Sequence, residues 1–247
     1  MGISRGMVLA VHSSLSSIGF VAGGPTAVVL ALEEALGTEG TLAMPTHTGD
    51  LSDPAEWCCP AVPKEWHERI RAEMPAYRSD MTPTCGMGTI PECFRCQDGV
   101  QRSNHPQVSW AAYGQHATLI VENHALDMSQ GETSPLARLY DLDAYVLLLG
   151  VGYRSNTCFH LAEYRWDLAA SSKCRRSTPM SRNGKTEWIE YDDIIWQEDD
   201  FTAIGASFET ETAAVTHGLV GQAESRLFSL RKAVDYATNW MNRNWSE

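Results

Sequence analysis

A histidine and a glutamate three residues apart, His160 and Glu163, are well suited to acid–base chemistry. They follow an apolar run at 145–151 and a polar segment at 152–157, so we expect a helix that carries both side chains. Residues three apart share one helix face, and a carboxylate beside an imidazole orients the ring and makes it a better base. The pair also fits a structural histidine at a helix start, so the spacing leaves both interpretations open.

The segment from His12 to Gly24 is the second region suited to binding a ligand. It contains several serines and ends in Gly23 and Gly24, directly before Pro25. Glycines let a ligand approach the backbone, and the free N–H groups of a helix start attract phosphate. A pyrophosphate site and a plain tight turn both fit this pattern. GxGxxG, GxxxxGK[ST] and GxSxG motifs are absent, so the sequence does not support a Rossmann site, a P-loop or a hydrolase elbow.

Acidic side chains gather in one stretch near the C-terminus. They are Glu190, Asp192, Asp193, Glu198, Asp199, Asp200, Glu209 and Glu211. Such a run is compatible with a solvated surface and with a subsite for a polycation, because each carboxylate would attract an ammonium group. The net charge of −12 points the same way, since it repels nucleic acids and anionic membranes and attracts cations.

The seven cysteines are odd in number and irregularly spaced. This argues against a disulfide framework and favours a reducing compartment. Cys93 and Cys96 form a single CxxC pair, whereas a zinc site needs about four ligands. The adjacent Cys58 and Cys59 are poorly placed to chelate one metal with that pair, so we predict no metal site.

The elements that must position these residues follow a strand–helix–strand order. An apolar run at 7–11, a helix at 25–36 and a second apolar run at 41–44 predict a βαβ unit and hence a parallel sheet. Further expected strands lie at 119–121, 145–151 and 186–191, and further helices at 64–73 and 222–242. We therefore expect an α/β fold, with a mostly parallel or mixed sheet flanked by helices, in one domain over residues 1–247. No apolar stretch is long enough for a membrane span, and residues 1–11 lack a signal-peptide cleavage site, which predicts a cytoplasmic protein.

A series of short motifs, taken in order, resembles the aminoglycoside 3-N-acetyltransferases, the antibiotic N-acetyltransferase family. The resemblance extends from residue 8 to about 240 and rests on the motifs at 11–15, 23–25, 40–46, 82–88, 102–106, 131–136, 148–152 and 160–163. This family has its own α/β fold and is unrelated to the GNAT acetyltransferases. Consistently, the chain has no Gln/Arg-x-x-Gly-x-Gly/Ala motif.

The resemblance implies transfer of an acetyl group from acetyl-CoA to the 3-amino group of an aminoglycoside, and hence a role in antibiotic resistance. His160 would be the general base in a ternary complex, and Glu163 would support it or contact the substrate. Such a transfer also needs an oxyanion donor, for which a backbone N–H and the hydroxyls of Thr157 and Ser103 are the candidates. By position, the residues that resemble the family's coenzyme A contacts are Ser13, Ser14, Val21, Gly23, Gly24, Ser103 and His105. Those that resemble substrate contacts are Asp80, Glu163, Asp192 and Asp193.

Two departures from the family pattern leave alternatives open. The chain starts almost at its first strand, where family members usually have a helix, and the stretch 57–60 is unusual for the region that could set drug range. The rival functions are an acetyltransferase of the same fold that acts on another amine and a non-catalytic antibiotic-binding protein. A metal-dependent hydrolase is a more distant rival, and the sequence does not distinguish a monomer from a homodimer.

Overall fold

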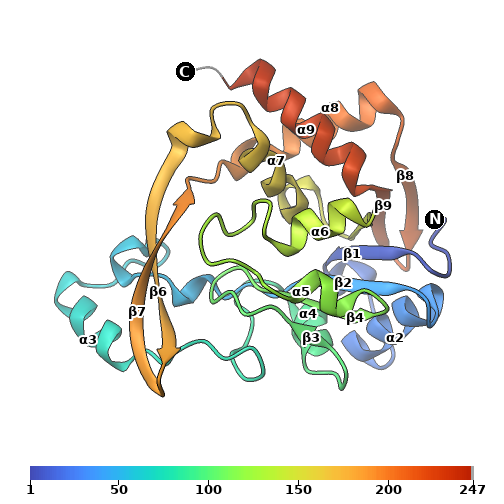
Figure 1. Ribbon diagram of the computed structural model, residues 1–247. Coiled ribbons are helices and arrows are strands. Elements are labelled where there is room, and N and C mark those ends of the chain that lie inside the picture. The colour runs from blue at the N-terminus through green and yellow to red at the C-terminus, as the bar shows by residue number, and fades with distance from the viewer. Residues whose placement is uncertain (246–247) are drawn as a thin grey trace.

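Seven strands of the computed structural model, which describes residues 1–245, form one mixed sheet (Figure 1). In spatial order they are β3 (Gln101–Arg102), β4 (Trp110–Gly114), β2 (Thr41–Pro45), β1 (Val8–Ser13), β5 (Tyr145–Leu149), β9 (Ala223–Ser229) and β8 (Thr216–Val220). The three central strands are parallel, since β1 pairs in parallel with both β2 and β5, and the outer pairings are antiparallel. The expected α/β fold with a mixed sheet is therefore confirmed. Residues 246 and 247 of the expected domain lie outside the described residues.

Helices cover both faces of this sheet (Figure 1). They are α1 (Leu15–Ile18), α2 (Gly24–Leu36), α4 (Thr89–Arg95), α5 (Ala117–Val121), α6 (Pro135–Asp141), α7 (His160–Arg165), α8 (Phe201–Thr212) and α9 (Leu230–Asn244). A further helix, α3 (His67–Glu73), has no buried residue and lies away from the sheet, at the far left of Figure 1. Along β1 the buried side chains alternate between the faces: Ala10 faces the α5–α9 layer, whereas Leu9 and Val11 face α2 and α4. Burial on both faces explains why the central strands are continuous apolar runs.

Short 3₁₀ turns connect many of these elements. They are η1 (Gly49–Leu51), η2 (Pro54–Glu56), η3 (Lys64–Trp66), η4 (Tyr153–Ser155), η5 (Thr157–Phe159), η6 (Ala169–Ser172) and η7 (Glu198–Asp200). No helix within residues 1–245 is both long and apolar enough to cross a membrane.

The predicted βαβ unit is confirmed as β1–α2–β2. Leu9 pairs with Leu42 in the parallel ladder, and α2 ends where Gly37 adopts a φ of +67°. Glycine is favoured there because it adopts a positive φ without a Cβ clash. The unit places the C-terminal ends of β1 and β2 at the same edge of the sheet.

Two predicted elements were wrong. Residues 119–121 belong to helix α5, not to a strand; Ala117, Ile120 and Val121 are its buried residues, at helical spacing. The expected helix at 222–242 is a strand over 223–229 followed by α9, whose cap Ser229 accepts a hydrogen bond from the Lys232 amide at 3.4 Å. Ala223 and Leu227 are four apart, so they satisfy a helical and an alternating pattern equally well.

A long hairpin forms a second, two-stranded sheet beside the main one, at the left of Figure 1. Its strands are β6 (Lys173–Arg182) and β7 (Lys185–Ile194), so the strand expected at 186–191 is confirmed as part of β7. Thr178 donates a hydrogen bond to the Leu51 carbonyl at 2.9 Å, and Tyr191 donates one to the Gln107 side chain at 2.7 Å. These contacts hold the hairpin against the loops that follow β2 and β3, and the end of β7 leads towards helix α7.

Candidate active site

A cavity of about 800 Å³ opens at the C-terminal ends of the three parallel strands. His12 and Ser13 reach it from β1, Pro45 from β2, and Val151 from the segment that follows β5. In open α/β sheets ligands bind outside the carboxyl ends of the strands, so this is where the fold favours a site.

Helix α7 places His160 on the wall of this cavity. The helix follows η5 directly, and Phe159, Leu161 and Ala162 are fully buried, which anchors this turn of the chain in the core. The imidazole packs against Phe201 and Trp196, with ring centroids 5.0 Å and 5.1 Å away. His160 itself is only 5% exposed, but it lines the cavity and so can meet a bound ligand.

The His160 ring lies between two carboxylates. Its Nδ1 is 2.5 Å from Oε2 of Glu163, and its Nε2 is 3.5 Å from Oε1 of Glu198. Glu163 is buried, and the Gln197 amide donates a hydrogen bond to its Oε1 at 2.5 Å. Glu163 therefore fixes the ring orientation, and Nε2 is the nitrogen left to face the cavity.

These carboxylates decide the charge of His160. Burial lowers the pKa of the imidazole, but the hydrogen bonds to Glu163 and Glu198 and their negative charges outweigh burial and raise it from 6.5 to about 9. The same interaction lowers the pKa of Glu198. In the unliganded protein at neutral pH, His160 is therefore an imidazolium held by two carboxylates.

Two more histidines line the cavity without any carboxylate partner. His12 lies beside the buried Cys158 thiol at 3.7 Å, and His47 follows β2. Burial, followed by the nearby charge of His160, lowers the pKa of both to about 3. They are neutral and contribute polar ring nitrogens, not charge, to the cavity wall.

The residues predicted to contact coenzyme A are divided by the structure. Ser13 and Ser14 line the cavity, whereas Val21, Gly23 and Gly24 belong to the loop and first turn of α2 and are not among its lining residues. Facing the serines is the segment 86–89, in which Gly86 and Gly88 adopt positive φ values of 73° and 88°. The Ser13 hydroxyl is buried without a hydrogen-bond partner in the described part of the chain, so it is free to bind a ligand.

Ser103 and His105 lie in the interior, away from the cavity lining. The Ser103 hydroxyl is 2.9 Å from Nδ1 of His124 and accepts a hydrogen bond from the Trp110 amide at 2.9 Å. His124 and His105 stack at 4.8 Å, and Nε2 of His124 is 2.6 Å from the Ser129 carbonyl oxygen. Because its hydroxyl is already hydrogen-bonded to His124 and to the Trp110 amide, Ser103 has a structural role in the unliganded protein.

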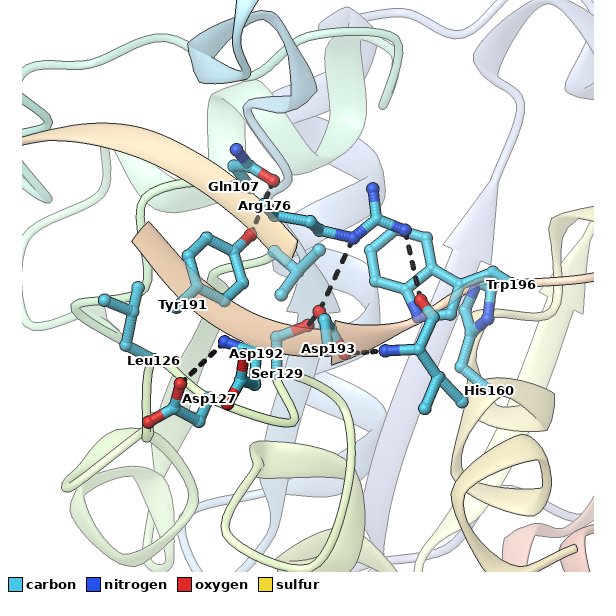
Figure 2. Close-up of polar contacts among 12 residues, drawn as sticks. Gln107, Leu126, Asp127, Ser129, His160, Arg176, Tyr191, Asp192, Asp193 and Trp196 are labelled. Carbon is cyan, nitrogen blue, oxygen red and sulfur yellow. Dashed lines mark hydrogen bonds and ion pairs between the residues drawn. The ribbon is translucent and has the colours of Figure 1, made fainter. Parts of the chain in front are cut away.

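The predicted substrate carboxylates do not converge on the cavity. Asp80 is exposed and pairs with Arg78 at 2.6 Å, and Asp192 is exposed and pairs with Arg175 at 3.2 Å. Asp193 is fully buried, where it lies beside Ser129 (Figure 2) and accepts a hydrogen bond from it at 2.6 Å. It accepts a second hydrogen bond, from Tyr164, at 2.5 Å. A substrate contact by these three aspartates therefore stays a prediction, and the unliganded structure gives it no support.

The Asp193 network reaches His160 indirectly. Tyr164, held by Asp193, accepts a hydrogen bond from the Trp196 indole at 2.9 Å. Trp196 in turn lies beside His160 (Figure 2). Arg176 stacks over the same indole at 4.4 Å. This network fixes the segment 195–198, which supplies the Gln197 amide and the Glu198 carboxylate to the site.

Sequence reasoning did not single out Glu198 and His47 as site residues. Glu198 is one member of an acidic run, and His47 one of eight histidines. Neither has a local partner in the sequence, because their contacts with His160 arise only when segments from β2, α7 and the end of β7 are brought together. The sequence feature that could have pointed to Glu198 as a site residue was its place in a cluster of carboxylates.

No cysteine is among the lining residues of this cavity in the described part of the chain, although Cys158 lies behind His12. All seven are free, and residues 1–245 contain no group of three or more His, Cys, Asp or Glu side chains placed to hold a metal ion.

Comparison with known proteins identifies the family. The sequence model described as aminoglycoside 3-N-acetyltransferase matches residues 10–242. The chain is 47% identical to the SPbeta prophage-derived aminoglycoside N(3')-acetyltransferase-like protein YokD of Bacillus subtilis, over 100% of this chain and 90% of that protein. It is 33% identical to aminoglycoside N(3)-acetyltransferase VII of Streptomyces paromomycinus, over 98% and 87%.

Solved structures agree with the sequences. The crystal structure of B. subtilis YokD superposes with a TM-score of 0.95 over 100% of this chain and 90% of that chain. AAC-IIIb in a binary complex with CoASH gives a TM-score of 0.85 at 27% identity, covering 98% and 92%. AAC-VIa bound to sisomicin gives 0.85 at 28% identity, covering 98% and 93%. With its fold, its cavity and these relatives in agreement, this chain belongs to the aminoglycoside 3-N-acetyltransferase family.

Proposed function

We propose that this protein transfers the acetyl group of acetyl-CoA to the 3-amino group of an aminoglycoside, with His160 as the general base in a ternary complex. The observation that carries the proposal is the ring of His160, held through Nδ1 by the buried Glu163 at 2.5 Å, with Nε2 turned to the cavity. The relatives crystallised with CoASH and with sisomicin support both substrates.

The proton balance assigns a defined task to His160. An ammonium group loses one proton to solvent to become a neutral amine, whose lone pair attacks the thioester carbonyl. Nε2 of neutral His160 removes a second proton from nitrogen as the C–N bond forms, and this proton passes to the departing thiolate to give CoASH. Glu163 contacts His160 and the Gln197 amide and does not line the cavity, so it is a positioning residue that stabilises the imidazolium formed in this step.

A donor is needed for the oxyanion of the tetrahedral intermediate. Of the two candidate hydroxyls from the sequence, that of Thr157 belongs to a residue that lines the cavity, whereas the hydroxyl of Ser103 is buried and occupied by His124 and Trp110. We therefore favour Thr157. The coenzyme would enter between Ser13 and Ser14 on one side and the segment 86–89 on the other. The reduced cysteines and the need for acetyl-CoA favour a cytoplasmic location.

The test is the mass of the product formed from acetyl-CoA and an aminoglycoside such as sisomicin or gentamicin. We expect a product heavier by one acetyl group, with release of free CoASH. Binding of the drug without any change in mass would instead indicate a sequestering protein. Acetylation of an unrelated amine in preference to aminoglycosides would indicate the rival transferase.

A further inference from the structure

Glu198 stands where the attacking amine has to arrive. Its Oε1 is 3.5 Å from Nε2 of His160, and this is the only ion pair that Glu198 makes among residues 1–245. Nδ1 of the same ring is committed to the buried Glu163. Both imidazole nitrogens are therefore engaged in the unliganded protein, and the base cannot act until Glu198 leaves Nε2.

The two carboxylates differ in their freedom to move. The Glu163 side chain is 2% exposed and is tied to the Gln197 amide, whereas the Glu198 side chain is 49% exposed. Glu198 also begins the short 3₁₀ turn η7 at the cavity rim, next to the exposed Asp199. A side-chain rotation releases Glu198 from His160 without disturbing the helix that carries the dyad.

Among the charged groups near His160, Glu198 is the carboxylate that an incoming cation would meet in the cavity. Glu163 lies behind the ring, and His12 and His47 face the cavity as neutral rings. Arg154 is at the rim, 3.8 Å from Asp199, and it also lines the cavity. Within the described residues, Glu198 is the carboxylate that lines this cavity.

We propose that Glu198 covers Nε2 of His160 in the unliganded enzyme and pairs with a second ammonium group of the substrate when that substrate binds. The exchange of partners exposes Nε2, whose proton then leaves to solvent. A substrate with two or more ammonium groups thus uncovers the base, while a monoamine does not. This selects polycationic amines, and it rests on the acetyl transfer proposed above.

The test compares E198Q with D199N, a matched control on the neighbouring exposed side chain. NMR titration of His160 in the free proteins should show a midpoint in E198Q lower than wild type by about one pH unit, the effect of removing one nearby opposite charge. Steady-state kinetics with sisomicin and with the monoamine glucosamine should show the preference for sisomicin reduced roughly tenfold, as expected for losing one ion pair of about 1.4 kcal/mol. D199N should match wild type in both measurements, and E198D should retain part of the preference.

Each result has a defined meaning. An unchanged His160 midpoint in E198Q would overturn the contact between the two side chains. A lowered midpoint with an unchanged preference for sisomicin would overturn the transfer of Glu198 to the substrate. Absence of any acetylated product from wild-type protein would refute the proposed function instead, and the titration would still report on Glu198.

Discussion

His160 at the cavity and His105 in the interior cluster are almost equally buried, yet the first is protonated at neutral pH and the second is neutral. His160 is 5% exposed and His105 1%. The pKa of His160 is raised to about 9, whereas burial, followed by the neighbouring His124, lowers that of His105 far below its usual value. Burial lowers the pKa of His124 as well, to about 4.

Their partners account for the difference. His160 lies between two carboxylates, whereas Nε2 of His105 is 3.2 Å from the Leu126 carbonyl, and its Nδ1 accepts hydrogen bonds from two backbone amides. A carbonyl dipole is too weak to offset the desolvation cost of a buried imidazolium, but the full negative charge of a carboxylate offsets it. Burial alone therefore keeps an imidazole neutral, whereas an adjacent carboxylate keeps it protonated.

The largest expected effect is that of H160A. Removing the base should lower kcat by about 10²–10⁴-fold, the usual contribution of acid–base catalysis. Binding of CoASH, measured by calorimetry, should change little, because Ser13, Ser14 and the segment 86–89 remain in place. Turnover close to wild type would remove His160 from the mechanism.

Neutralising the orienting carboxylate should have the next largest effect. E163Q should reduce kcat by about 10²-fold, because the ring loses its orientation and the charge that stabilises the imidazolium. The acid limb of the kcat/KM profile should also move to lower pH, a change that a purely structural role would not cause. Partial recovery in E163D is expected, and an unmoved acid limb would contradict the assignment.

Truncation in the interior cluster should affect stability instead of chemistry. H124A leaves the Ser103 hydroxyl and the Ser129 carbonyl without their partner. This should lower the free energy of unfolding by about 1–3 kcal/mol, the cost of unsatisfied buried groups. Urea denaturation measures the loss, and kcat per folded molecule should match wild type. A selective loss of kcat at unchanged stability would place this cluster in the active site.

The neutral cavity histidines and His160 should give stability opposite dependences on pH. His12 and His47 have folded pKa values of about 3, so the unfolded chain binds more protons below pH 6.5 and stability falls as the pH drops from 6.5 towards 3. For His160 the folded pKa of about 9 exceeds 6.5, so its contribution is complete below pH 6.5 and is lost as the pH rises through 9. Thermal unfolding should therefore show a maximum near pH 6.5. The decline above it should be smaller in H160A, and an identical decline would contradict the raised pKa.

The sequence alone predicted those features that depend on the spacing of nearby residues. The pairing of His160 with Glu163 follows from their spacing on one helix, and the βαβ unit from its apolar periodicity. The switch from strand to helix at Ser229 was missed because residues 223–229 fit both patterns. Contacts between segments that are distant in the sequence could not be predicted in this way.

Tertiary contacts also separate the acidic residues that the sequence groups together. Within the seven residues 192–198, Asp192 lies on the surface, Asp193 is buried at the end of β7, and Glu198 contacts His160. Nothing in the sequence distinguishes the three, because their roles depend on which segment each one packs against. The resemblance placed Ser103 and His105 at the coenzyme, whereas the structure places them inside a hydrogen-bond network next to the hairpin.

NMR titration of the histidine side chains tests most directly whether Glu163 and Glu198 raise the pKa of His160 above that of the other buried histidines. Spectra of wild-type protein and H160A, recorded from pH 4 to 10, assign the His160 resonance by its loss. We predict that this resonance titrates near pH 9 and that those of His12 and His47 remain those of neutral imidazoles from pH 5 to 10. A His160 resonance that titrates at or below pH 6.5 would contradict the account.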